Sequence, residues 1–357
     1  MAVYTTINDP SAYFQTLLYT GNATGRSLDN TGNSNLKPDW IWAKKRSAVQ
    51  NHTVTDSSRG VGNILFPDGG DAESATQLVT EFRTNGFGIN NNALINDNSA
   101  TYVAWQWKAN GGTTTTNDAS STGVGSIDSV YQANTTAGFS IITYTGTGST
   151  ATIGHGLNSA PEMIITKARS DGHSWLVGCT ADSSDLSSVL VLQSTAASVT
   201  ATGNYNAAPN SSTYQVVSAG GTNNNTDTYV AYVFHSVQGY SKIGSYTGNG
   251  NVDGPFVYTG FKPAWLLTKR TDYSDNWRLV DSTRYPFNDG SANCLLPNKT
   301  NNETDSGARN LDLLSNGFKV RTNDPDSNSS DGGSTYIYMA FAESPFVSSE
   351  GVPTTAR

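Results

Sequence analysis

Residues 139–146 read Phe-Ser-Ile-Ile-Thr-Tyr-Thr-Gly, and Tyr-Thr-Gly stands at the start of three similar blocks of the chain, at 19–21, 144–146 and 246–248. Each block continues with a proline, an apolar run that ends in a lysine, and a closing aromatic segment. A block of about 100 residues has the size of a small domain, whereas solenoid repeats take about 20–50 residues. The landmarks lie at 19–21, Pro38, Lys44 and 102–105, then at 144–146, Pro161, Lys167 and 229–232, and finally at 246–248, Pro263, Lys269 and 336–341.

The composition favours strands over helices. The 357 residues include 35 Gly and 17 Tyr, and the acidic residues are 23 Asp and only 6 Glu. Asp suits turns and caps, whereas Glu suits helix faces. Short segments with a period of two, such as 140–144, alternate with closely spaced turn signals. We therefore expect an all-β protein with three tandem antiparallel β-sandwich domains, jelly-roll-like, each with its own core.

The landmarks and the local composition predict the domain boundaries. Between the first and second blocks lies a tract made almost wholly of Gly, Thr, Ser, Asn and Ala, which is typical of a flexible or extended linker. The second and third blocks follow each other almost directly, so we expect them to pack rigidly. The expected parts are module 1 with an N-terminal arm at 1–110, the linker at 111–136, module 2 at 137–237, module 3 at 238–346 and a polar, frayed tail at 347–357.

Some local elements can also be predicted. Asn-Gly at 85–86 and at 316–317 indicates hairpin turns, and module 2 lacks this signal. Four apolar residues between 75 and 82 have helical spacing, which leaves open a short helix or a coincidence. On each closing segment, side chains alternate between two faces, so either the tyrosine or its neighbour should form the core. These pairs are Tyr102 and Val103, Tyr229 and Val230, and Tyr336 and Ile337.

The charge and the motifs argue against several function classes. The net charge of −8 and the absence of a long Lys/Arg run make nucleic acid a poor partner. No segment is apolar enough for a membrane span or a signal peptide. The four histidines form no metal-binding pair, no phosphate-binding glycine motif occurs, and no glutamate recurs between the blocks. We therefore predict no catalytic, metal-binding or cofactor-binding residues, no cofactor, and no enzymatic activity.

Three features keep an alternative open. The segment Asp324–Asp331 begins like a calcium loop and then departs from it, and polar loops stand at the same place at 96–98 and 223–227, so we expect solvated turns with a weak cation site as the alternative. The lone turn histidine, His155, is interpreted as structural. Cys179 and Cys294 are expected to be buried free thiols, although a disulfide between them stays open.

The seven tryptophans are the remaining candidates for a sugar-binding surface. Several match between the blocks, and matched aromatic residues on alternating strands are more often core than ligand platform. Trp107 is the least explained, because it follows the first closing segment beside the linker. The seven are Trp40, Trp42, Trp105, Trp107, Trp175, Trp265 and Trp277.

The blocks resemble the repeated β-domain structural proteins of marine tailed phages, of the cyanophage type. The opening at 5–16, the segment 138–146, Gly154 to Leu157 leading to Pro161, and the ending at 102–109 carry the resemblance. It implies a virion structural protein: a tail fibre, a tail appendage or a capsid-surface fibre, made in the host cytoplasm and assembled as a homo-oligomer or on other virion proteins. Host-surface glycan is a further expected partner. The alternative is a protein that binds or depolymerises host polysaccharide.

Overall fold

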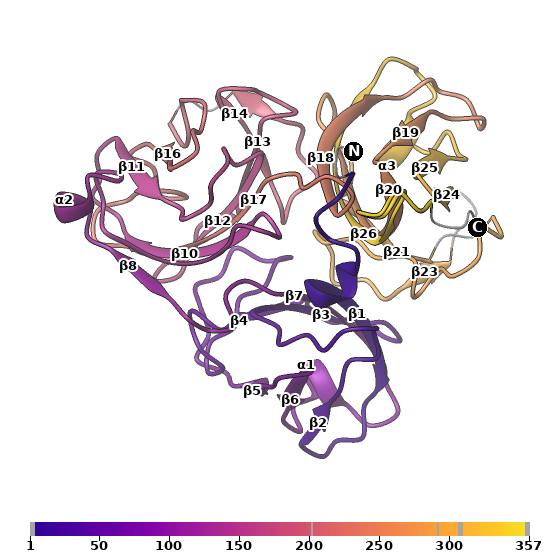
Figure 1. Cartoon of the computed structure of the whole chain (residues 1–357), viewed down its shortest axis with the longest axis horizontal. Helices are drawn as coiled ribbons and strands as arrows, with labels where there is room; N and C mark the ends of the chain where they lie inside the picture. Colours follow the sequence, from indigo (N-terminus) through magenta and orange to yellow (C-terminus); the bar gives the residue numbers. More distant parts are fainter. Residues whose placement is uncertain (1–3, 201–202, 291–292, 306–309, 354–357) are drawn as a thin grey trace.

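The computed structural model describes residues 4–200, 203–290, 293–305 and 310–353, and its regular structure is almost entirely antiparallel β-sheet. Three lobes, one for each repeat, lie around a common centre (Figure 1). The expected all-β class is confirmed. None of the described helices has the length and hydropathy that a membrane crossing by a helix requires.

Each module contains the same four-stranded arrangement, in which the first and last strands of the repeat are neighbours. In module 1 the sheet order is β1-β7-β3-β4, and a smaller sheet, β2-β6-β5, lies apart from it. The strands are β1 (Phe14–Thr20), β2 (Arg26–Leu28), β3 (Trp40–Lys45), β4 (Thr53–Asp56), β5 (Val79–Phe82), β6 (Phe87–Ile89) and β7 (Thr101–Trp107), with a 3-10 turn η1 (Pro10–Ala12) and a short helix α1 (Ala93–Asn96).

Module 2 repeats this order as β10-β17-β12-β13 and extends it at both edges to eight strands, β15-β14-β13-β12-β17-β10-β9-β8. Its second sheet is the pair β11-β16. The elements are β8 (Thr115–Asn117), α2 (Ala119–Thr122), β9 (Ser129–Asn134), β10 (Phe139–Thr145), β11 (Ala151–Gly154), β12 (Met163–Ala168), β13 (Leu176–Cys179), β14 (Ser188–Val191), β15 (Val199–Thr200), β16 (Thr213–Val216) and β17 (Thr228–Phe234).

Module 3 has the order β18-β26-β20-β21 and a second sheet β19-β25-β24. All three landmark prolines are buried, and each stands two residues before the residue that pairs with Trp107, Phe234 or Phe341 of the closing strand. The elements are β18 (Ser241–Thr247), β19 (Phe256–Tyr258), β20 (Phe261–Arg270), β21 (Arg278–Asp281), β22 (Asn293–Cys294), β23 (Thr304–Asp305), β24 (Leu311–Leu314), β25 (Gly317–Val320), α3 (Pro325–Asn328) and β26 (Thr335–Pro345).

The predicted linker at 111–136 is wrong. Strand β9 pairs with β10 along its whole length, β8 pairs with β9, and α2 lies between them. Gln132 on β9 is fully buried and donates to Ser57 Oγ of module 1 at 2.9 Å. Composition misled here because an edge strand needs only backbone partners on one side, which polar Thr and Ser residues supply as well as apolar ones.

Two further local expectations can be compared with the structure. The helical spacing between 75 and 82 was a coincidence, since Val79–Phe82 forms strand β5 of the predicted hairpin with β6. The Asn-Gly turns at 85–86 and 316–317 are confirmed as hairpins, and the described part of module 2 lacks one. In the tail, Val347 bridges Pro353, and residues 354–357 lie outside the described residues.

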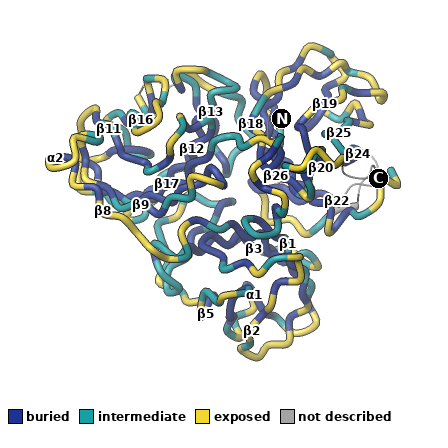
Figure 2. The backbone as a smooth tube through the Cα atoms, viewed as in Figure 1, coloured by how far each residue is buried: buried dark blue, intermediate teal, exposed yellow. Residues whose placement is uncertain are grey.

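In every large sheet, the closing strand and the strand after the landmark proline are buried on both faces over most of their length. On one face a core internal to each module holds the landmark tyrosines, which are fully buried and stack on the tyrosine of the Tyr-Thr-Gly strand at 4.9–5.1 Å. On the other face Val103, Val230 and Ile337 join one core that all three modules share. The sequence predicted burial of either the tyrosine or its neighbour, and the structure buries both. Figure 2 shows these buried segments where the three lobes meet.

Three large rings at equivalent strand positions meet in the shared core. Trp107 and Phe234 end their closing strands, and Phe341 holds the same register position in the longer strand β26. Phe341 lies 5.6 Å from Trp107 and 6.0 Å from Phe234. Trp107 also stacks against Trp40 at 4.4 Å. Because apolar burial contributes about 25 cal/mol per Å², these rings join the modules more strongly than surface contacts would. The three modules therefore have interdependent cores, in contrast to three separate domains.

A repeated hydrogen bond also fastens each module to its neighbour. The residue just before β4, β13 and β21 is aromatic in each module. Its ring nitrogen bonds to a main-chain carbonyl oxygen of the adjacent module. The bonds run from His52 to Leu296 at 3.2 Å, from Trp175 to Phe66 at 2.8 Å and from Trp277 to Val191 at 3.0 Å.

A buried ionic network connects modules 1 and 2. Arg59 contacts Asp56 at 2.5 Å and Glu73 at 2.7 Å, and Glu73 in turn accepts two bonds from Arg169 of module 2. Tyr232 of module 2 donates its hydroxyl to Asp56 at 2.7 Å. Every charge that is withdrawn from water thus has a partner of opposite sign, as buried ions require.

The same network recurs between modules 3 and 1. Arg284 contacts Asp281 at 2.5 Å and Glu303 at 2.9 Å, and Glu303 accepts from Arg46 of module 1 at 2.7 Å. In place of the tyrosine, Trp105 donates its indole N–H to Asp281 at 2.9 Å. The two interfaces therefore use one design with a different buried donor.

The interface between modules 2 and 3 lacks this network. By strand register, Cys179 replaces the aspartate and Met339 replaces the hydroxyl or indole donor. Ser198 and Thr271 hold the positions of the glutamate and the outer arginine and are joined by the backbone bond at 2.8 Å. Ser198 Oγ also donates to Asp182, which holds the position of the inner arginine. Loss of the carboxylate is matched by loss of its donor, because a buried donor without a partner costs about 1–3 kcal/mol.

Replacing Tyr336 with alanine is expected to lower the free energy of unfolding by about 3–5 kcal/mol, because the ring is fully buried against Tyr246. Tyr336→Phe keeps the ring and removes only the hydroxyl, which donates to Pro325 O and accepts from Ser329 N, each at 2.8 Å. That variant should cost about 1–3 kcal/mol. Chemical denaturation of the three proteins measures both effects, and equal stability of Tyr336→Ala and the parent would contradict the assignment.

Candidate functional site

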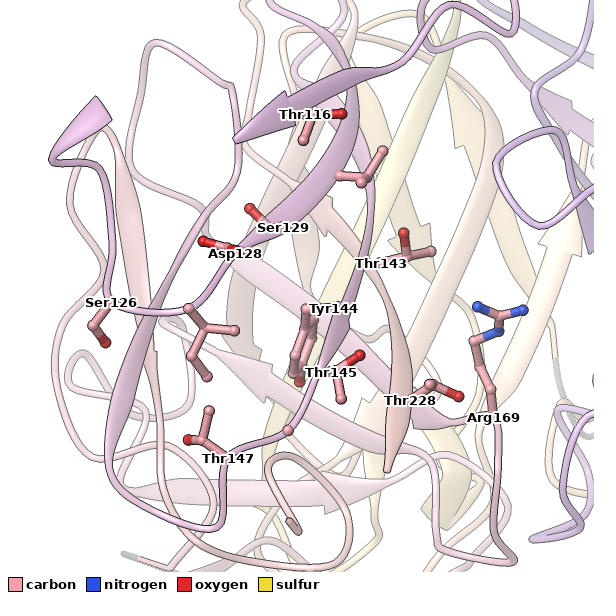
Figure 3. Close-up of a pocket in the computed structure, with 13 residues that line it drawn as sticks. Thr116, Ser126, Asp128, Ser129, Thr143, Tyr144, Thr145, Thr147, Arg169 and Thr228 are labelled. Carbon is pink, nitrogen blue, oxygen red and sulfur yellow. The ribbon is translucent and has the colours of Figure 1, made fainter. Parts of the chain in front are cut away.

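A large open groove lies on module 2, where strands β8 and β9 extend the sheet. It has a volume of about 610 Å³ and is bounded by β9, β10 and the loops that follow β10 and β12 (Figure 3). The strand extension that builds one wall is the tract predicted to be a linker. The lining residues are Thr116, Ser126, Ile127, Asp128, Ser129, Val130, Thr143, Tyr144, Thr145, Gly146, Thr147, Arg169 and Thr228.

Hydroxyl groups dominate the groove. Seven of its side chains are Ser or Thr, and Thr116, Thr145 and Thr147 are exposed. Such groups both donate and accept hydrogen bonds, so they suit a neutral ligand with many hydroxyls. The groove is therefore chemically compatible with a polysaccharide.

The charged groups and the aromatic ring of the groove already have partners. Asp128 accepts the backbone N–H of Ala119 at 2.9 Å, and Arg169 is held by Glu73. Tyr144 stacks on Tyr229 and is itself buried. Asp128 is the one carboxylate among the lining residues, whereas glycoside hydrolysis ordinarily uses two. The groove thus fits binding better than cleavage.

None of the seven tryptophans lines the groove. All seven are fully buried, and they belong to the shared core, as does the previously unexplained Trp107. The interpretation as core residues is confirmed. A sugar platform made of tryptophan is therefore excluded within the described surface.

Two histidines are buried and neutral. His155 accepts the backbone N–H of Leu157 at Nδ1 and contacts Asn210 O through Nε2, and burial lowers the pKa of His155 to about 4. His52 accepts the indole N–H of Trp42 at Nδ1, so its Nε2 carries the proton directed at module 3, and burial holds the pKa of His52 well below its usual range. The structural interpretation of His155 is confirmed.

The segment Asp324–Asp331 is a partly buried turn, in which 326–329 are buried whereas Pro325, Ser330 and Asp331 are exposed. Asp324 caps α3 by accepting from Asp326 N at 3.0 Å, and Asn328 is fully buried. Asn328 Oδ1 accepts from the backbone after Tyr-Thr-Gly at 2.7 Å, as Asn96 and Asn223 do in the other modules. The expectation of solvated turns therefore holds only for part of each turn, because the asparagine is buried and joins the two ends of its repeat.

The cysteines are both free and buried, as expected. Burial raises the pKa of the Cys179 thiol to about 12, so it stays protonated and unreactive at neutral pH. It serves packing in the interface between modules 2 and 3.

A family model described as a domain of unknown function (DUF7483) matches residues 9–345. The chain belongs to this family. The match runs through all three modules as one domain, in agreement with their shared core. A search of curated proteins finds no match.

The free energy of unfolding is expected to fall as the pH drops from about 6.5 toward 4. In this window His52 and His155 bind protons in the unfolded chain but stay neutral in the folded chain. Each site therefore lowers the free energy of unfolding by about 1.4 kcal/mol for each pH unit of acidification. Denaturation curves between pH 7 and pH 4 measure this slope. His155→Gln should reduce it, whereas Val49→Ser, at an exposed position without a titrating group, is the control. A flat profile for the parent would contradict the buried neutral state.

Proposed function

We propose that the protein is a non-catalytic structural or adhesive component of a tailed-phage particle, in a tail fibre, a tail appendage or a capsid-surface fibre. The observation that carries the proposal is the core shared by the three modules. The largest rings and the buried ion pairs hold the three modules in one arrangement. Such a chain is suited to act as a rigid building block. The sequence resemblance to phage structural proteins supports the same role.

The surface supports contacts with proteins and glycans over contacts with nucleic acid. The net charge is −8, and nucleic-acid binders normally present a basic face. Strand β19 lies at the edge of its sheet, and its Phe256 and Tyr258 are 46% and 54% exposed. Exposed aromatic residues on a strand edge favour association with another protein chain.

Light scattering and binding to particles that lack the protein test this role. We expect the purified chain to form a homo-oligomer or to bind such particles, and cryo-electron microscopy of complete particles to locate it. Phe256→Ser should weaken the association at least tenfold, whereas Val49→Ser, at an exposed site of module 1, should leave it unchanged. A monodisperse monomer that never binds the particles would overturn the proposal.

A second candidate function is binding of host-surface polysaccharide, which the hydroxyl-lined groove of module 2 favours. Thr145→Trp would fill the groove and should abolish binding to a polysaccharide array. Thr20→Trp changes the equivalent position of module 1 and is the matched control, since it should leave binding intact. No binding by the parent chain would refute this candidate.

The absence of turnover is tested separately by following the release of reducing ends from host polysaccharide. We expect none. Sustained release that Asp128→Asn abolishes would instead establish a depolymerase and contradict the non-catalytic role.

A further inference from the structure

Two loops of module 2 bring together an imidazole and two carboxylates. Asp171 and His173 follow strand β12, and Asp227 precedes β17. His173 Nε2 lies 3.8 Å from Asp171 Oδ2 and 3.7 Å from Asp227 Oδ2, and the ligand atoms of the group all lie within 4.8 Å of one another. We propose that these three residues bind a divalent transition-metal ion.

The distances favour a bound ion over direct contacts. Hydrogen bonds between nitrogen and oxygen span about 2.7–3.2 Å, so His173 makes none with either carboxylate. Bonds from Zn²⁺ to imidazole nitrogen and carboxylate oxygen measure about 2.0–2.2 Å. Two ligand atoms of one ion therefore stand roughly 3–4 Å apart, which matches the spacing seen from His173 to the two aspartates.

A second observation concerns His173 alone. Its Nε2 atom is buried and has no hydrogen-bond partner among the described residues, although it points between two carboxylates. Such an atom loses its bond to water without compensation unless a ligand supplies one. The ring also occupies space that only a glycine leaves free, since a Cβ at Gly220 would lie 2.4 Å from the ring.

The outer contacts of the aspartates leave the inward oxygens accessible. Asp171 accepts the N–H of Gly172 at Oδ1 with a distance of 2.6 Å, and Asp227 accepts from Ser170 at Oδ1. Asp227 Oδ2 also accepts from Asn224 at 2.9 Å, which orients it while a lone pair remains. Contacts of this kind position ligands in known metal sites.

The charges around the site favour a cation. The nearby cations have their own partners, because Lys167 donates to Ala168 O and Asp171 O, and Arg169 pairs with Glu73. The two aspartates carry two negative charges, and the ammonium of Lys167, which interacts with Asp171, offsets only part of them. One imidazole with two carboxylates suits Zn²⁺ or Mn²⁺, whereas Ca²⁺ prefers oxygen ligands alone. With three protein ligands, the coordination shell would be completed by water.

Among the residues that the structure describes, only module 2 has such a group of ligands. By their spacing from the repeated lysine, Gln50 of module 1 and Asp275 of module 3 hold the position of His173. An ion here would tie the loop after β12 to the loop before β17, next to the contact between Glu73 N and Arg169 O that joins modules 1 and 2. This role does not depend on the proposed function as a particle component.

Calorimetric titration of untagged, chelator-treated protein with Zn²⁺ tests the site. We expect one ion per chain, and at least a tenfold loss of affinity in His173→Ala and in Asp171→Asn. Asp171 is exposed, so its substitution leaves the fold intact and keeps the test decisive if His173→Ala does not fold. His235→Ala is the control, because His235 Nε2 also lacks a partner but belongs to no metal-ligand group among the described residues.

Co²⁺ provides a second readout through its visible absorption, which should appear with the parent and with His235→Ala and disappear with Asp171→Asn. Failure of the parent to bind Zn²⁺ would overturn the proposal, as would equal binding by Asp171→Asn. Equal affinity for Ca²⁺ would also overturn it, since the imidazole would then contribute nothing.

Discussion

The structure depends on one constraint: the central strands of each large sheet place buried side chains on both faces. A smaller sheet can cover only one of them, as in the internal core around each landmark tyrosine. The second face can leave water only against another large sheet, and three such sheets cover one another when they meet at a common centre. The mutual cover explains why the modules form one unit, and why a single family model spans residues 9–345.

Packing of the three modules around the shared core also buries charged groups at its rim, and these groups need partners. Asp56 and Asp281 are completely buried, and each is neutralised by an arginine three residues later and by a donor from the next module. At the third interface both the carboxylate and the donor are replaced by sulfur-containing side chains. Each interface therefore has either both the buried carboxylate and its donor or neither of them. One without the other would be a buried polar group without a hydrogen-bond partner.

Departures from the repeat gather in module 2. It has the additional strands β8 and β9, the hydroxyl-lined groove that they border, and the group of Asp171, His173 and Asp227. The repeated positions are occupied by core residues that cannot change without loss of packing. The loops outside the repeat are free of that constraint, so a binding role can develop there while the shared core holds the frame.

The sequence by itself determined the all-β class, the three copies, the hairpins at Asn-Gly and the burial of the landmark tyrosines, because period-two patterns and turn residues act locally. Only the tertiary structure decided that the tract at 111–136 joins a sheet, since pairing at a strand edge depends on the backbone of a distant strand. The segment Asp324–Asp331 is buried for a similar reason, as its asparagine bonds to backbone 79 residues away. The meeting of Asp171 and His173 with Asp227 likewise required the fold, because those residues are separated by more than 50 positions and no local motif links them.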